Sequence, residues 1–115
     1  SEIARLDRTM VIVAADLAHM GPSFGDPEPM DATAKVSLAA TDAEMMATIC
    51  RGDAEGFLAM LTAEQDERKV CGLPPIYLAM KMLGDGITGE VVDYSVCPAP
   101  DESVVSVTGI LLLTA

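Results

Sequence analysis

The chain has 115 residues and half of them are apolar, so it can build one domain with a hydrophobic core and is not a disordered tail. Seven basic and 18 acidic residues give a net charge of −11, which repels nucleic-acid phosphates and anionic lipid surfaces and excludes both as partners. The sequence has no apolar run long enough to span a membrane, and its three cysteines lack paired spacing, which favours a reducing, cytoplasmic location.

The first predicted element is a strand at residues 9–15, TMVIVAA. Such a continuous apolar run is typical of a strand buried on both faces, as in a parallel α/β sheet. Polar residues follow at 16–22, where open α/β sheets place their ligands. Residues 21–31 are rich in proline and glycine and predict a loop.

Three helices are predicted next. Thr41 and Glu44 form a capping box, which predicts that the first helix starts at Thr41. A second helix follows Asp53, and a third opens at Pro74 or Pro75 and ends at Gly84. The predicted buried faces are Ala43, Met46, Ala47 and Cys50, then Ala54, Phe57, Leu58 and Leu61, then Ile76, Ala79, Met80 and Leu83. The charged residues 62–69 are expected to be exposed.

Two strands, at residues 90–97 and 103–113, close the chain and are expected to pair antiparallel. Residues expected to share one face are Val92, Tyr94 and Val96 in one strand and Val105, Val107, Leu111 and Leu113 in the other. The predicted fold is therefore α/β, in the order β-α-α-α-β-β. Residues 1–115 form a single domain or a domain fragment.

His19 is the single histidine, and it follows Asp16 by three residues. A carboxylate at this spacing can reach the imidazole and fix its tautomer, which makes His19 a candidate general acid/base or metal ligand. The alternative is a histidine at the end of a loop, with an aspartate that caps the next turn.

Cys71 stands just before Gly72 and the proline-opened helix. A thiol near a helix N-terminus is favoured as a thiolate, which can bind a metal or act as a nucleophile. The alternative is a small buried residue under the third helix. Cys50 and Cys97 are interpreted as core residues. One histidine, one aspartate and one cysteine do not complete a metal site by themselves.

Two motifs in this order resemble the Memo-like family, also called AmmeMemoRadiSam system protein B. Residues 11–21, VIVAADLAHMG, resemble the family's strand followed by S-x-D-L-S-H-aromatic-G, and residues 70–76, VCGLPPI, resemble its I-C-G-R-x-P-I. Residues 92–95 resemble its Y-x-S strand, and residues 103–109 resemble its closing V-S-Y-A strand. The resemblance covers nearly all of this chain but only the C-terminal part of the family's length.

The resemblance implies a relation to class III extradiol ring-cleavage dioxygenases, which hold ferrous iron with two histidines and a carboxylate. In Memo-like proteins a cysteine replaces the carboxylate, and Cys71 matches it. Asp16 and His19 match the pair beside the metal, and His19 is the candidate for proton transfer. The family's two metal histidines lie in its N-terminal half, outside this chain. The implied cofactor is Fe(II), and the implied substrate is a small aromatic, catechol-like molecule.

Several departures remove polar or stacking groups: Ala18 stands for a serine, Met20 for an aromatic residue and Leu73 for an arginine. They put substrate binding in doubt more than metal binding. Three hypotheses follow. In the first, the chain is the C-terminal part of a Memo-like metalloprotein, whose active or vestigial metal site is shared with a missing N-terminal segment. In the second, it is a non-catalytic interaction module of the same fold. In the third, it is an unrelated acidic α/β domain.

An extradiol-type oxidoreductase activity would need the missing ligands, so the chain alone is expected to be inactive. A truncated sheet exposes its edges, which favours a homo-oligomer or pairing with the missing N-terminal part.

Overall fold

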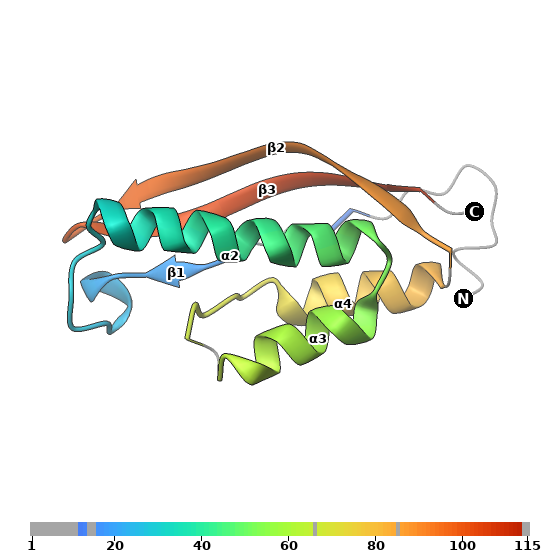
Figure 1. Cartoon of the computed structure of the whole chain (residues 1–115), viewed down its shortest axis with the longest axis horizontal. Coiled ribbons are helices and arrows are strands. Elements are labelled where there is room, and N and C mark those ends of the chain that lie inside the picture. The colour runs from blue at the N-terminus through green and yellow to red at the C-terminus, as the bar shows by residue number, and fades with distance from the viewer. Residues whose placement is uncertain (1–11, 14–15, 66, 85, 114–115) are drawn as a thin grey trace.

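A computed structural model describes residues 12–13, 16–65, 67–84 and 86–113. Its elements are β1 (His19–Met20), the 3-10 helix η1 (Pro22–Phe24), α2 (Ala32–Cys50), α3 (Ala54–Ala63), α4 (Leu73–Leu83), β2 (Thr88–Ala99) and β3 (Ser103–Leu113) (Figure 1). Apart from the 3-10 turn, the predicted order of one strand, three helices and two strands is confirmed by element type, although the first described strand is His19–Met20 and not residues 9–15. None of the described helices is long and apolar enough to cross a membrane.

The three strands form one antiparallel sheet in the order β1-β3-β2. β2 and β3 pair along their length, as predicted, whereas β1 contributes only two residues at the edge of β3. Helix α2 runs along the two long strands, and α3 and α4 lie beyond it (Figure 1). The described sheet is therefore antiparallel, and the parallel arrangement expected from the apolar run at residues 9–15 is not found in it.

The predicted strand at residues 9–15 falls mostly outside the described residues. Of its members that are described, Ile12 and Val13 belong to no strand, and Ile12 is 79% exposed instead of buried. The first described strand comes later, at His19. An apolar run without periodicity identifies neither the type of element nor its burial, which explains the difference.

Helix α2 begins at Ala32, well before the predicted start at Thr41. Asp31 is the N-cap, and its side chain accepts a hydrogen bond from the Ala34 N–H at 2.8 Å. Thr41 lies inside the helix, where its hydroxyl donates to the Ser37 carbonyl at 2.9 Å. Residues 32–40 contain neither glycine nor proline, so nothing stops the helix from extending back to the Asp31 cap.

The buried face of α2 also differs from the prediction. The buried residues are Leu38, Asp42, Met45, Met46, Thr48 and Ile49, whereas Ala43 and Ala47 are exposed. The predicted face was chosen from apolar spacing alone and did not include Asp42, since a carboxylate is rarely buried without a partner. In the fold this carboxylate has partners, so the helix turns that side inward.

Helices α3 and α4 agree with their predicted patterns. Phe57 and Leu61 of α3 are buried, and Ala79 and Met80 of α4 are buried. Prolines occupy the first turn of α4, and the helix ends at Gly84, whose φ of 81° favours glycine. Phe57, Leu61 and Met80 join Leu17, Met45, Ile49 and Ile87 in the main hydrophobic core.

The apolar residues of β3 that were expected to share a face lie on the outer face of the sheet. Ile110 and Leu112 pack against the core, whereas Leu111 and Leu113 are 47% and 57% exposed. In β2, a bulge between Val91 and Asp93 leaves Val92 70% exposed, so it does not share the half-buried positions of Tyr94 and Val96. Both faces of β3 are apolar, so alternation alone could not select the inner one.

Candidate metal centre

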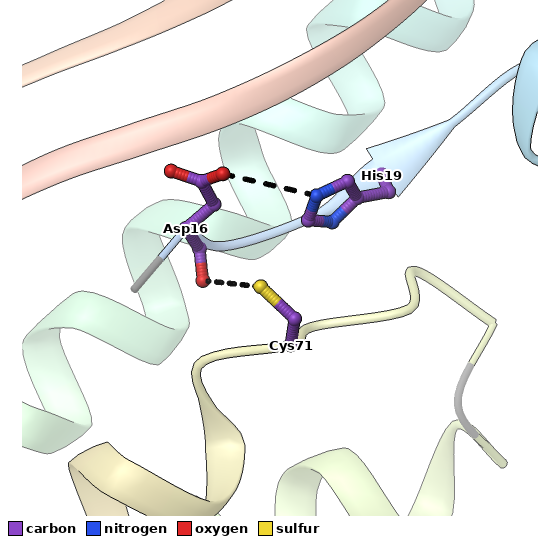
Figure 2. A group of neighbouring side chains, drawn as sticks. All are labelled: Asp16, His19 and Cys71. Carbon is purple, nitrogen blue, oxygen red and sulfur yellow. Dashed lines mark hydrogen bonds and ion pairs between the residues drawn. The ribbon is translucent and has the colours of Figure 1, made fainter. Parts of the chain in front are cut away.

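Asp16, His19 and Cys71 come together in the fold. Their potential ligand atoms all lie within 4.8 Å of one another. His19 Nε2 is 3.9 Å from an Asp16 carboxylate oxygen, and the Cys71 thiol lies 3.5 Å from the Asp16 carbonyl oxygen, which accepts its hydrogen bond (Figure 2). Cys71 and Asp16 are separated by 55 positions in the sequence. Folding therefore unites the two motifs that the sequence analysis singled out separately.

His19 is held by the loop that carries Cys71. Its backbone N–H donates to the Arg68 carbonyl at 2.8 Å, and its ring Nδ1 lies 3.1 Å from the Lys69 carbonyl. A carbonyl oxygen only accepts hydrogen bonds, so this contact places a hydrogen on Nδ1. In the neutral ring the lone pair is then on Nε2, the atom nearer Asp16. This is the arrangement that an imidazole needs to bind a metal or accept a proton.

The segment before His19 is fixed to strand β3 through Ser106. The Ala18 N–H donates to the Ser106 hydroxyl at 3.0 Å, and the Leu17 N–H donates to the Ser106 carbonyl at 2.9 Å. The Ser106 N–H in turn donates to the Ala18 carbonyl at 3.0 Å. Ser106 is fully buried, so the two residues between Asp16 and His19 are fixed to the core of the sheet.

Phe24 forms an aromatic wall beside His19. The two rings meet edge to face, with centroids 5.2 Å apart and an interplanar angle of 84°. Met20 stands where the family has an aromatic residue, but Phe24, in the loop that follows, places an aromatic ring against the histidine, which the sequence motifs do not predict. The scarcity of aromatic residues, of which the chain has only four, is the signal that could have identified it.

An ion pair links the loop that carries Phe24 to Lys69. Lys69 Nζ lies 2.9 Å from one Asp26 oxygen, and the Gly21 N–H donates to the other oxygen at 2.8 Å. Burial by itself would raise the pKa of Asp26, but the Gly21 hydrogen bond and the Lys69 ammonium outweigh it and lower that pKa. The η1 loop is therefore tied to the same loop that carries Cys71.

A buried charge network lies behind the site. Arg68 is 4% exposed and pairs with Asp42, which is fully buried, and with Glu64, whose oxygens lie 2.7–3.2 Å from the guanidinium. The Tyr94 hydroxyl donates to the second Asp42 oxygen at 2.6 Å. The expected exposure of residues 62–69 is thus wrong at Arg68, because two carboxylates compensate for its burial.

The network also shifts two pKa values. Desolvation would lower the pKa of Arg68, but the hydrogen bonds and charges of Glu64 and Asp42 raise it overall. Burial, followed by the hydrogen bond to the Asp42 carboxylate and its charge, raises the pKa of Tyr94 well above its ordinary value. Both groups are therefore held in the protonated form.

The three residues are accessible from solvent. Asp16 and Cys71 are exposed and His19 is half-buried. A shallow depression of about 400 Å³ lies along Lys69, Val70, Cys71, Leu73 and Pro74, so a small molecule could approach the thiol. Of the other two cysteines, Cys50 is half-buried and Cys97 is exposed, which corrects the expectation that Cys97 is a core residue.

The donor set fits a transition metal. An imidazole nitrogen, a thiolate and a carboxylate are all first-row metal ligands, and the thiolate favours softer ions. Metal–ligand bonds of roughly 2.0–2.3 Å need only small movements from the observed separations. Three ligands leave further positions for ligands from outside the described residues or for a substrate.

A model of the family described as Memo-like protein matches residues 1–111. The chain belongs to the Memo-like family. No curated protein matches it. The match covers both motifs and the closing strands of this Memo-like chain, so the resemblance seen in the sequence is confirmed at the level of the family. The roles of Cys71 as a metal ligand and of His19 and Asp16 as catalytic groups remain predictions.

Proposed function

We propose that this Memo-like chain contributes one wall of a non-haem metal centre related to that of class III extradiol dioxygenases. Cys71 would be a direct ligand, and the remaining ligands would come from an N-terminal segment of the protein outside these 115 residues. The observation that carries the proposal is the convergence of Asp16, His19 and Cys71, from two distant segments, to within 4.8 Å. Chance pairs of acid and histidine are common, but a thiol that meets them from a separate loop is not explained by local sequence.

Fe(II) is the metal that the family relationship implies, and it would supply a Lewis-acidic, redox-active centre. The protein's own residues would handle the proton. His19 Nε2 would accept a proton from a substrate hydroxyl while Nδ1–H stays bonded to the Lys69 carbonyl. The Asp16 carboxylate, 3.9 Å away, would then face a positively charged ring. A small aromatic, catechol-like substrate would pack near Phe24.

The test is anaerobic loading of the full-length protein with ferrous iron, followed by measurement of bound iron per chain and of its affinity. We expect Cys71→Ala to weaken binding at least about tenfold, the loss that even an outer-shell partner can cause. Cys97→Ala is the matched control, because it removes another exposed thiol and should bind as the wild type does. Equal affinity in the two variants would remove Cys71 from the ligand set.

A second candidate is a non-catalytic interaction module of the same fold. One observation favours it: Val92, Leu111 and Leu113 expose apolar side chains on the two long strands, 70%, 47% and 57% respectively. In that case the wild type would bind no ferrous iron, and Leu111→Lys would reduce concentration-dependent self-association in sedimentation experiments. Either function suits a reducing compartment such as the cytoplasm, because all three cysteines are free thiols.

A further inference from the structure

Lys69 has a backbone conformation that lysine rarely adopts. Its φ is +49°, in the left-handed region, where a side chain with a Cβ is strained. Residues held in such conformations persist only where the surrounding structure fixes them, and they concentrate at functional sites. The carbonyl of this strained residue is the one that meets His19 Nδ1. The strain is therefore located at the contact that sets the tautomer of His19.

The residue before Lys69, Arg68, is held firmly by its side chain. Arg68 is buried and its guanidinium joins Asp42 of helix α2 to Glu64 at the end of α3. Carboxylates from α2 and from the end of α3 thus hold one side chain of the loop. The Arg68 carbonyl also accepts the His19 N–H. Consecutive carbonyls, at Arg68 and Lys69, therefore receive the backbone and the ring of the same histidine.

The arrangement allows little variation. Asp42 is fully buried and uses both of its oxygens, one for Arg68 and one for Tyr94. Within the described part of the chain, no buried side-chain nitrogen or oxygen lacks a hydrogen-bond partner. A buried ion pair is weak evidence for a gain in stability, since desolvation opposes its attraction. Its position beside a strained residue that contacts the candidate site indicates a role in geometry.

We propose that Arg68 is a positioning residue of the metal centre: its buried pairs with Asp42 and Glu64 hold the Lys69 carbonyl against His19 Nδ1, so that the lone pair of the neutral ring is on Nε2, the nitrogen nearer Asp16. The role of this arrangement in metal binding rests on the proposed function. The geometry itself can be tested without any metal.

The test uses the single histidine of the chain, because its ring nitrogens give one set of signals in ¹⁵N nuclear magnetic resonance. In the neutral ring of the wild type we expect the hydrogen on Nδ1. Arg68→Lys keeps the positive charge but cannot bridge two carboxylates with a planar fork, so we expect the population with hydrogen on Nε2 to rise several-fold. Arg51→Lys is the matched control, since Arg51 is exposed and, among the described residues, its side chain bonds to Thr48 one turn away.

A folded Arg68→Lys protein with the wild-type tautomer overturns the proposal. If Arg68→Lys does not fold, Glu64→Gln decides, because it weakens the Arg68 anchor at its outer side and leaves the buried Asp42 pair in place. A wild-type tautomer in folded Glu64→Gln then overturns the proposal, and a partial shift toward hydrogen on Nε2 supports it. The proposed function fails independently of this inference if the wild-type protein has hydrogen on Nδ1 as expected but binds no ferrous iron.

Discussion

At the scale of single residues, the candidate site depends on supporting residues outside the group of Asp16, His19 and Cys71. Arg68 and Lys69 fix His19, Ser106 fixes the segment before it, and Phe24 covers its ring. The sequence motifs identified Asp16, His19 and Cys71. They could not identify these supports, because a buried arginine, a backbone carbonyl and a loop phenylalanine have no spacing rule in the sequence.

The Asp26–Lys69 ion pair predicts a specific pH dependence. The pKa of Asp26 is lowered from its ordinary value of 3.8 in the folded protein, so the ionised form stabilises the fold above that pH. This stabilisation is lost as the pH falls below 3.8 through the folded-state pKa. We therefore expect Asp26→Asn to lower the urea midpoint at pH 6 and to match the wild type in strong acid.

Urea titrations at a series of pH values measure this difference. Glu28→Gln is the control for the loss of one negative charge, because Glu28 is an exposed residue of the same loop. A difference between wild type and Asp26→Asn that persists unchanged into acid would show that the carboxylate's charge is not what ties the loop.

At the scale of elements, the cap of α2 distinguishes the observed helix from the predicted one. Asp31→Ala removes the hydrogen bond to the Ala34 N–H and should cost about 0.5–2 kcal/mol of unfolding free energy. Thr41→Ala should change it far less, since Thr41 is inside the helix and bonds to a carbonyl one turn back. Chemical denaturation of both variants measures the two values. A larger loss for Thr41→Ala would restore the capping box as the helix start.

The sequence predicts some elements well and others poorly for identifiable reasons. Phe57 and Leu61 follow helical spacing, the prolines and Gly84 mark the ends of α4, and β2 and β3 pair antiparallel as their sequences predict. The start of α2 was predicted at Thr41 and is wrong, because the capping box of Thr41 and Glu44 lies inside a helix that begins earlier, at the Asp31 cap. Its buried face was misread because the burial of Asp42 depends on Arg68, a partner 26 positions away.

At the scale of the whole molecule, the three thiols differ in their exposure to solvent. Cys71 and Cys97 are exposed, whereas burial and the nearby Glu90 charge raise the pKa of the half-buried Cys50. Because the thiolate is the reactive form, we expect Cys50 to react most slowly with a maleimide. Mass spectrometry after brief labelling measures each rate. Ferrous iron should protect Cys71 and leave Cys97 unchanged, and slow labelling of Cys97 instead would contradict this assignment of environments.

The short strand β1 has a consequence for how occupancy of the site could be followed. It has two residues, and the amides of His19 and of the two residues before it, Leu17 and Ala18, donate their hydrogen bonds to Ser106 and Arg68. Short elements of this kind open locally far more often than the core unfolds. A ligand that binds only the closed arrangement suppresses that opening in proportion to its concentration over its dissociation constant. The rates at which these three amide protons exchange with solvent should therefore fall when a metal binds. They measure occupancy of the site even when no reaction can be followed.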